Sequence, residues 1–431
     1  MKVLMFGWEF PPFISGGLGT ASYGIAKGLI HNDVDLTFVM PTRRGLKFES
    51  GINIIAADEV HTIERFNKII TTLKKYDTST ITKSFTIAPY FTSEDYMEYF
   101  NTHHDMIELK KVLQSQKGLL HFTGNYGKNL LDEVYRYGII GEIIGFGNDF
   151  DIIHAHDWLT FHAGVAAKRS SGKQLVVHVH ATEFDRSGEN VNQQVYDIER
   201  FGMENADKII AVSYFTKNII TSRYGIHPDK VEVVHNAVDK NRRLDAYGIK
   251  KNVDEKIVLF LGRITMQKGP DYFMEAAHRV YKKYKNVRFV MAGSGDMLPR
   301  MITRMASLRM IDRFHFTGFL KGIDVERMYA LSDLYVMPSV SEPFGIAPFE
   351  ALLYDVPIII SRQSGVAEVL KNAIKVDFWD INKLSEMILM LIENDKVANE
   401  VAEKCKEDMS NIGWDNAGLR IKNVYESVLK N

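Results

Sequence analysis

The stretch KIVLFLG (256–262), in the middle of the chain, repeats the pattern of KVLMFG (2–7) at its beginning. Each has a lysine, a short apolar run and a glycine, which is typical of a buried parallel strand that ends in a tight loop. Because the two copies lie in different halves of a 431-residue chain, we expect each to open a sheet of its own.

Short β-branched runs alternate with helical patterns on both sides of the second copy, which indicates parallel sheets with crossover helices. The sequence therefore predicts an α/β protein with two doubly wound parallel-sheet domains facing each other across a cleft. The predicted strands are 2–6, 35–40, 151–154, 175–180, 208–212 and 231–234, and then 257–261, 287–291, 313–316, 334–337 and 356–360.

The polar segment 241–255 separates the two sets of strands. We expect an N-terminal domain over 1–240, with irregular insertions at about 57–147, and a second domain over 241–412. The last residues, 413–431, have the apolar spacing of an amphipathic helix.

Bulk composition excludes several classes of protein. With 45% hydrophobic and 25% charged residues and a net charge of -1, the chain offers no electrostatic argument for binding nucleic acid or an acidic membrane. The single cysteine, Cys405, excludes an intrachain disulfide and a cysteine-rich zinc site. The N-terminus is too short for a signal peptide and no apolar run is long enough to span a bilayer, so we expect a soluble cytoplasmic protein without membrane insertion.

Loops that follow strands are the expected place for a binding site, because open parallel sheets bind ligands at the carboxyl ends of their strands. After the first strand, Gly16 and Gly17 precede a helix, which suits an anion near backbone N–H groups or simply a tight turn. The G-x-G-x-x-G pattern is absent and the second strand ends in MPTRRG, so we exclude binding of NAD.

Two His-x-His pairs, in HAHDW (154–158) and HVHATEFDR (178–186), each end a strand. Strand alternation places each pair on one face, which is compatible with a metal site or with buried histidines held by hydrogen bonds. A binuclear hydrolase would need aspartate where Trp158 stands, so we favour the second interpretation and expect no metal.

In the second half, GRITMQKG (262–269) places Arg263 and Lys268 on a loop after a strand, where both suit a diphosphate, although a solvated basic pair is the simpler alternative. Gly293 lies at another junction of strand, glycine and helix.

The stretch SVSEPFGIAPFEALLYDVP (339–357) carries two carboxylates, Glu342 and Glu350. Pro348 suits only the first turn of a helix, so we expect the helix to start near Phe344 or Gly345. A carboxylate near a helix N-terminus is favourable by about 0.3–1 kcal/mol, which explains Glu350 but not Glu342. The backbone N–H groups of Phe344, Gly345 and Ile346 are then available for a phosphate.

These motifs in this order resemble the retaining glycosyltransferases of the GT-B fold, which have two Rossmann-like domains. The likeness is greatest to the glycogen and starch synthase group and the broad sugar-nucleotide transferase family beside it. It covers nearly the whole chain except roughly 57–147, and NADKIIAVS (205–213), VEVVHNAVD (231–239), FTGFL (316–320) and SGVAEVL (364–370) agree with it. The resemblance implies that the helix over 413–431 crosses back to the N-terminal domain.

The resemblance implies a nucleoside diphosphate sugar, ADP-glucose or UDP-glucose, as substrate, with no cofactor and no metal. Arg263 and Lys268 would stabilise the departing diphosphate, and His180 would lie near the hydroxymethyl group of the donor sugar. Glu342 would hold the sugar hydroxyls, Glu350 the ribose, and Asp157 would lie close to the sugar or acceptor. The phosphates would meet Gly16, Gly17 and Leu18 from the N-terminal side; the remaining donor-binding candidates are Phe344, Gly345, Ile346 and Gly293.

The acceptor implied by the resemblance is an α-glucan, with no nucleic acid as partner. Ile14 stands where ADP-glucose-using glycogen synthases carry a lysine, which weighs against ADP-glucose. Transfer to a small sugar, a sugar phosphate or a lipid, a sugar-nucleotide epimerase, and a non-catalytic glucan-binding protein remain as alternatives. The oligomeric state stays open.

Overall fold

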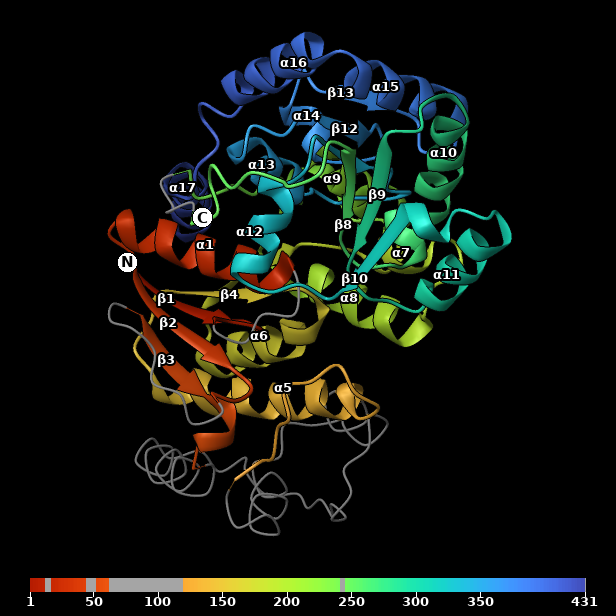
Figure 1. Cartoon of the computed structure of the whole chain (residues 1–431). Helices are drawn as coiled ribbons and strands as arrows, with labels where there is room; N and C mark the ends of the chain where they lie inside the picture. The colour runs from red at the N-terminus through yellow and green to blue at the C-terminus, as the bar shows by residue number, and fades with distance from the viewer. Residues whose placement is uncertain (12–16, 44–51, 62–118, 241–244, 431) are drawn as a thin grey trace, which may run out of the picture.

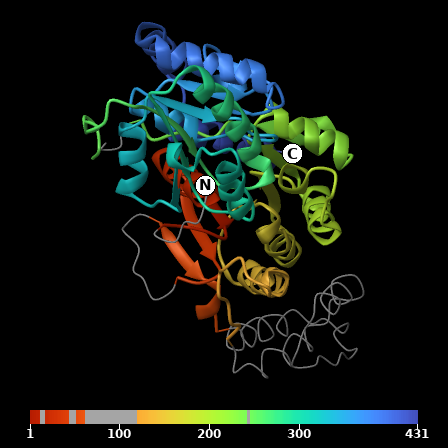
Figure 2. The ribbon, with the colours of Figure 1, turned by 45° about the vertical axis from the view of Figure 1, so that its right-hand side comes forward.

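A computed structural model describes residues 1–11, 17–43, 52–61, 119–240 and 245–430. Ile14 and Gly16 of the first glycine-rich loop lie outside these residues. The described chain forms two lobes, each built around its own sheet (Figure 1), and the lobes stay distinct when the molecule is turned (Figure 2).

The N-terminal lobe contains a seven-stranded parallel sheet in the order β3-β2-β1-β4-β5-β6-β7. Its strands are β1 (Lys2–Phe6), β2 (Asp35–Met40), β3 (Asn53–Ala56), β4 (Ile152–His156), β5 (Gln174–Val179), β6 (Lys208–Ala211) and β7 (Val231–Val233). Its helices are α1 (Gly17–His31), α5 (Leu130–Gly147), α6 (Trp158–Ser171), α7 (Glu183–Ser187), α8 (Gln193–Asn205) and α9 (Tyr214–Arg223), with short 3-10 turns η1 (Ala57–Glu59) and η2 (Pro228–Lys230).

The C-terminal lobe contains a six-stranded parallel sheet in the order β10-β9-β8-β11-β12-β13. Its strands are β8 (Lys256–Leu261), β9 (Val287–Ala292), β10 (Phe314–Gly318), β11 (Leu334–Met337), β12 (Ile358–Ser361) and β13 (Ile374–Val376). Its helices are α10 (Pro270–Lys283), α11 (Leu298–Ser307), α12 (Ile323–Ala330), α13 (Ala347–Leu353), α14 (Val366–Val369), α15 (Ile381–Glu393) and α16 (Asp395–Asp408), with 3-10 turns η3 (Met266–Lys268) and η4 (Ile311–Arg313). The last helix, α17 (Trp414–Leu429), follows them along the chain.

Both sheets follow the doubly wound order, in which the chain first builds outward in one direction and then in the other. The reversal lies between β1 and β4 in the first sheet and between β8 and β11 in the second. Crevices at the carboxyl ends of these four strands are where such folds bind ligands. The predicted fold, two parallel-sheet α/β domains of the GT-B type, is confirmed.

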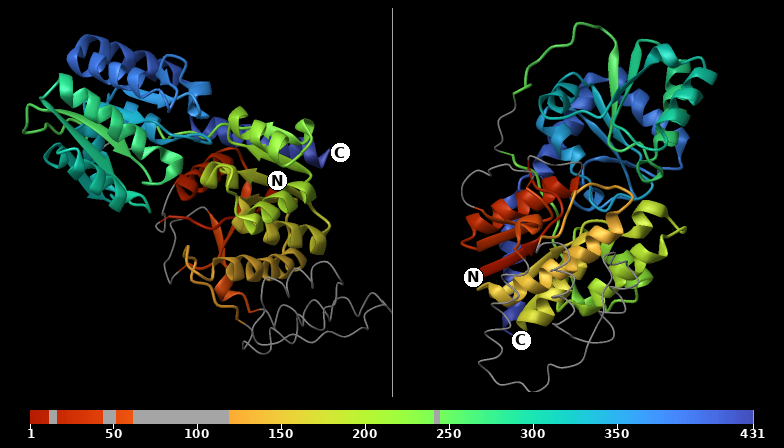
Figure 3. Two further views of the ribbon diagram at one scale, coloured as in Figure 1. Left: turned by 90° about the vertical axis from the view of Figure 1, so that its right-hand side faces the viewer. Right: turned by 90° about the horizontal axis from the view of Figure 1, so that it is seen from below.

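Alternation along the strands separates two cores in the N-terminal lobe. Leu4 and Phe6 of β1 face α5, α6 and α8, whereas Val3 and Met5 face α1 and α17. The C-terminal helix α17 therefore completes the core of the N-terminal lobe although it follows the second sheet (Figure 3, left).

Several elements differ from those predicted. Helix α5 lies within 57–147, the range predicted to be irregular. The sequence pattern did not predict this helix, because it is buried on most sides and lacks a clear polar face. Strands β3 and β13 have only four and three residues and show little sequence pattern. Among the described residues, no helix combines the length and apolar character needed to cross a membrane.

Candidate active site

The four loops at the points where strand order reverses carry most of the predicted site residues. Gly17 and Leu18 open α1 after β1, and Asp157 immediately follows β4. Arg263 follows β8, and Glu342 lies in the loop after β11. The topology therefore brings residues from four distant parts of the sequence to the carboxyl edges of the two sheets.

An ion pair between Lys268 and Glu342 joins two of these loops. The ammonium group of Lys268, at the end of η3, contacts Oε2 of Glu342, and the two side chains are 22% and 7% exposed. Ser339 Oγ donates a hydrogen bond to the same carboxylate oxygen at 3.2 Å. Partial burial strengthens such a charge-assisted contact and holds both charges in place.

Gln267, which the sequence analysis did not single out, connects Arg263 to the Glu342 loop. Its side-chain oxygen accepts a hydrogen bond from Arg263 Nη2 at 2.9 Å, and its carbonyl accepts one from Val340 N at 2.9 Å. Gln267 is buried, whereas Arg263 is exposed. In the sequence, only its position between Arg263 and Lys268 in the same loop indicated that Gln267 could belong to the site.

The helix after Glu342 begins later than predicted. Helix α13 starts at Ala347 rather than near Phe344 or Gly345, and Pro348 is in its first turn as expected. Gly345 has φ +97°, outside the helical region, so the chain must turn there before the helix begins. The carbonyl of Phe344 accepts a hydrogen bond from Val366 N at 2.7 Å, and its side chain is buried.

Two other candidate residues have defined hydrogen bonds. Glu350, in the first turn of α13, accepts a hydrogen bond from the hydroxyl of Tyr329 at 3.2 Å. Gly293 follows β9, and its N–H donates to the carbonyl of Gly318 at 2.9 Å. That N–H is therefore already engaged within the protein.

His180 and Asp157 lie together in the N-terminal lobe. Oδ1 of Asp157 accepts a hydrogen bond from the backbone N of His180 at 2.6 Å and a longer one from Ala181 N at 3.4 Å. Burial raises the pKa of Asp157 to about 7 and lowers the pKa of His180 to about 3. Asp157 also has φ 57°, a strained conformation for an aspartate that is found most often at functional sites.

Four histidine rings stack at the ends of β4 and β5, on the face of the sheet that α17 covers. His154, His156 and His178 have ligand nitrogens within 4.8 Å of one another, so they form a candidate metal group. However, the His154 and His178 planes lie 14° apart, and those of His156 and His178 lie 21° apart. Burial lowers the pKa of all three histidines, so the rings are neutral near pH 7. Closely packed neutral imidazoles account for this arrangement, and Nδ1 of His154 already lies 2.6 Å from the hydroxyl of Tyr425.

Hydrogen bonds from the N-terminal lobe reach the Glu342 loop on both sides. Ser341 Oγ donates to Oδ1 of Asp185, and Ser213 Oγ donates to the carbonyl of Pro343, each at 2.5 Å. Burial raises the pKa of Asp185, although its hydrogen bonds with Ser341 and Thr182 oppose that effect. Sequence reasoning could not find these contacts because the partners are more than one hundred residues apart.

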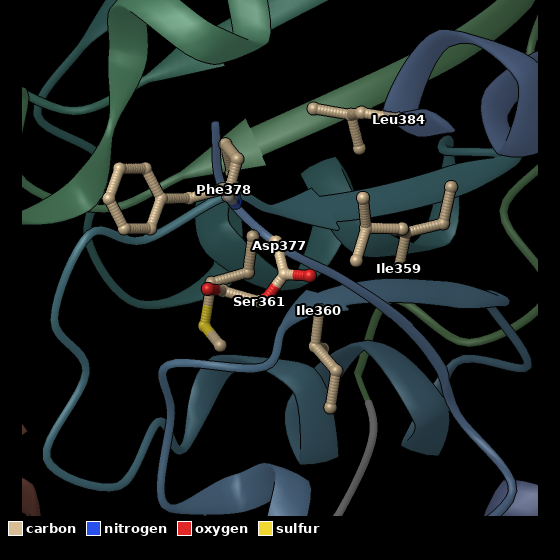
Figure 4. Close-up of a pocket in the computed structure, with 9 residues that line it drawn as sticks. Ile359, Ile360, Ser361, Asp377, Phe378 and Leu384 are labelled. Carbon is tan, nitrogen blue, oxygen red and sulfur yellow. The ribbon is translucent and has the colours of Figure 1, made fainter. Parts of the chain in front are cut away.

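A small pocket lies at the ends of β11, β12 and β13 (Figure 4). Most of its lining side chains are apolar, and it is too small to hold a water molecule. Asp377 at its edge accepts a hydrogen bond from Gln363 Nε2 at 2.9 Å, and the Gln363 carbonyl accepts one from Glu342 N at 3.0 Å. These two hydrogen bonds link Asp377, at the edge of the pocket, through Gln363 to the backbone of Glu342.

Two family models match adjoining parts of the chain. Residues 122–242 match Glycosyltransferase Family 4, and residues 242–408 match Glycosyl transferases group 1. The chain is 26% identical to an uncharacterised glycosyltransferase of Methanocaldococcus jannaschii, with 100% of this chain and 99% of that protein covered.

Two further relatives have named activities. The glycogen synthase of Mycobacterium tuberculosis is 22% identical, with 99% of this chain and 94% of that protein covered. The D-inositol 3-phosphate glycosyltransferase 1 of Catenulispora acidiphila is 25% identical, with 65% of this chain and 73% of that protein covered.

Solved structures share the fold along the whole chain. The sucrose-phosphate synthase of Thermosynechococcus elongatus superimposes with a TM-score of 0.71 at 14% identity, covering 100% of this chain and 99% of its own. Anabaena HepE, solved with UDP and glucose, gives a TM-score of 0.63 at 16% identity, with 99% and 100% covered. The two matched regions, the curated relatives and the pair of parallel sheets identify the chain as a glycosyltransferase of the GT-B fold.

Proposed function

We propose that the protein transfers a hexose, with glucose as the first candidate, from a nucleoside diphosphate sugar to an α-glucan, with retention of anomeric configuration. The main supporting observation is the cationic pair that follows β8, in which Lys268 is held by Glu342 and Arg263 by Gln267. Both cations lie on the loop after β8, beside the point where the strand order reverses. Folds of this kind bind phosphate-containing ligands at that point.

Breaking the bond between the sugar and the diphosphate leaves an electron pair, and hence negative charge, on the phosphate oxygen. Arg263 and Lys268 stabilise that charge, and because their partners hold them in advance, little reorganisation is needed during the reaction. The acceptor hydroxyl attacks the same face of the sugar, its oxygen bonds to the anomeric carbon, and its proton passes to the leaving phosphate. No protein nucleophile or metal takes part in this scheme.

The remaining roles concern the donor. Glu342 accepts hydrogen bonds from the sugar hydroxyls, and His180 contacts the hydroxymethyl group. Glu350 binds the ribose, and Gly17 and Leu18 meet the phosphates from the opposite lobe. Asp157 holds the backbone of His180 and so acts on the sugar indirectly. The amides of Phe344, Gly345 and Ile346 complete the phosphate site.

A sugar phosphate is the second candidate acceptor. It is favoured by the similarity to the D-inositol 3-phosphate glycosyltransferase of Catenulispora acidiphila, which is 25% identical. The similarity to the Mycobacterium tuberculosis glycogen synthase extends over nearly the whole of both chains, and we therefore place the α-glucan first.

A donor and acceptor panel tests both candidates. Purified protein is mixed with ADP-, UDP- or GDP-sugars, alone, with glycogen, or with inositol 3-phosphate, and nucleotide release is measured. Glycogen-dependent release supports the proposal, and NMR of the product anomer tests retention. Release that depends on inositol 3-phosphate supports the second candidate. Sugar interconversion without acceptor would indicate an epimerase, and absence of turnover with every pair would contradict both acceptors.

A further inference from the structure

Asp185, in the short helix α7 of the N-terminal lobe, forms a hydrogen bond with Ser341 of the other lobe. Oδ1 of Asp185 accepts from Ser341 Oγ at 2.5 Å, and Oδ2 accepts from the backbone N and the hydroxyl of Thr182 at 2.7 and 2.8 Å. Asp185 is only 1% exposed. A buried carboxylate requires hydrogen-bond donors, and those of Asp185 come from both lobes.

This hydrogen bond is a short connection between His180 and Glu342, the two groups proposed to hold the donor sugar. His180 lies two residues before Thr182, the N-cap of α7, and Ser341 immediately precedes Glu342. Along the chain His180 and Glu342 are far apart and belong to different lobes. Their relative position therefore depends on contacts between the lobes such as this one.

Helix α7 is itself held in place by the guanidinium group of Arg186. Nε of Arg186 donates to Oε2 of Glu183 at 3.0 Å, and Nη1 donates to the carbonyl of Ala181 at 3.3 Å. Nη2 donates to the carboxylate of Glu199 on α8, which also accepts from the backbone N of Glu183 at 3.0 Å. These partly buried, charge-assisted contacts fix α7 against α8, so Asp185 has a firm support.

On the opposite side, Ser341 is attached to the loop that carries the two cations. The backbone N of Val340 donates to the carbonyl of Gln267 at 2.9 Å, and that of Ser341 donates to it at 3.4 Å. Gln267 lies between Arg263 and Lys268 and accepts a hydrogen bond from Arg263. Helix α7 also contacts η3 directly. The hydrogen bond of Ser341 therefore connects α7 to the cationic loop as well as to the Glu342 loop.

We infer that Asp185 is a positioning residue, whose hydrogen bond with Ser341 sets where His180 lies relative to Glu342. Asp185 acts on the donor sugar through these two residues. The role in sugar transfer rests on the proposed function, whereas the connection between the lobes does not.

Hydrogen exchange measured by mass spectrometry tests the connection. Ser341→Ala removes the donor hydroxyl, and Ser341→Thr keeps it. Ser332→Ala is the matched control, because the Ser332 hydroxyl donates to the carbonyl of Met328 within one lobe. We expect faster exchange over 180–188 and 339–346 in Ser341→Ala, and the unsubstituted rates in Ser341→Thr and in the control.

Kinetics test the positioning role. We expect Ser341→Ala to lower kcat/KM for the donor sugar about tenfold, as for loss of one hydrogen bond to a charged group, and Ser341→Thr to recover most of it. In an Asp185→Asn background, Ser341→Ala should cost less, because a neutral amide holds a hydroxyl less tightly than a carboxylate does. Equal losses in both backgrounds would exclude Asp185 as the partner and overturn the inference.

The remaining outcomes separate the connection, the positioning role and the proposed function. Unchanged exchange in Ser341→Ala would overturn the connection, and so would faster exchange throughout the protein, which indicates a general loss of stability. The expected exchange together with normal kcat/KM in Ser341→Ala would overturn the positioning role. Absence of transfer with every donor, together with the expected exchange, would contradict only the proposed function.

Discussion

Lys268 and Glu342 show how single residues position charge in this protein. A lysine ammonium on a flexible stem would lose much conformational freedom if it were fixed only on binding a diphosphate. Here the carboxylate of Glu342, itself 7% exposed, already holds the ammonium before any donor is present. The ammonium group is therefore held in place in advance, which is the property that would make electrostatic stabilisation effective in the proposed reaction.

Replacement of Lys268 by alanine should lower kcat by more than about 100-fold, because in the proposed mechanism the ammonium group that is removed meets the charge developing on the leaving diphosphate. Single-turnover and steady-state rates measure the effect in protein whose folding is confirmed by circular dichroism. Lys283→Ala, at an exposed lysine in the last turn of α10, is the control and should leave kcat unchanged. Nearly normal turnover of Lys268→Ala would remove this residue from the mechanism.

The change Glu350→Gln should mainly raise the KM for the donor, because the proposed contact is with the ribose and not with the reacting bond. Tyr329→Phe removes the hydroxyl that donates to Glu350 and should have a smaller effect in the same direction. Initial rates over a range of donor concentrations give both constants. If KM is unaltered in Glu350→Gln, the ribose contact is wrong.

His178 allows a test of how the histidine stack affects stability. Burial lowers its pKa well below 6.5, so below pH 6.5 the unfolded chain binds a proton that the folded protein does not. The free energy of unfolding therefore falls as pH falls, by about 1.4 kcal/mol for each pH unit and each such histidine.

Between pH 7.5 and 5.5, His178→Phe should lose about 1.4 kcal/mol less stability than the unsubstituted protein. Urea unfolding at the two pH values measures the difference. His227→Phe, at an exposed histidine, serves as the control and should follow the unsubstituted protein. An identical loss in all three proteins would show that His178 titrates normally.

At the scale of elements, the contact between α1 and α17 joins the two ends of the chain. A Cβ atom built on Gly418 would lie 2.3 Å from the carbonyl carbon of Gly28, and one on Gly28 would lie 2.0 Å from the carbonyl oxygen of Trp414. The helices thus approach backbone to backbone, which only glycine permits. From this position Tyr425 of α17 forms a hydrogen bond of 2.6 Å with Nδ1 of His154.

Gly418→Val should displace α17 and destabilise the protein by about 1–3 kcal/mol, the usual cost of overpacking. Thermal unfolding and the intrinsic fluorescence of Trp414 report the change. Gly413, at the N-cap of the same helix, has open space around it, so Gly413→Ala is the matched control and costs only the loss of a good N-cap residue, below about 1 kcal/mol. Equal Tm values for the two variants would rule out the close packing.

At the scale of the whole molecule, the Glu342 loop lies where the lobes meet. Glu368 of α14 accepts hydrogen bonds from Tyr214 N at 3.0 Å and Phe215 N at 2.7 Å, at the first turn of α9 in the other lobe. The same carboxylate contacts Nε2 of His235 at 2.8 Å. A carboxylate at a helix N-terminus is stabilised by the helix dipole, so this contact favours the observed lobe arrangement.

Glu368→Ala should loosen the contact between the lobes. We expect a larger radius of gyration in small-angle X-ray scattering and a donor KM raised about three- to tenfold, as for loss of one or two hydrogen bonds. Glu386→Ala, at an exposed glutamate on α15, is the control. If both variants scatter identically, Glu368 does not hold the lobes together.

The sequence alone determined the two sheets, because short, mostly apolar runs that alternate with helical patterns specify buried parallel strands. Strands β1, β2 and β11 have the predicted bounds. It also placed Arg263, Lys268 and Glu342 in loops after strands, because the carboxyl end of a strand fixes where the following loop begins. The start of α13 could not be found, because the conformation of Gly345 depends on its surroundings. Only the tertiary structure decided three contacts: Lys268 with Glu342, Ser341 with Asp185, and His156 with His180. The two residues of each pair lie on different segments of the chain, and no local sequence pattern shows which distant segments come together.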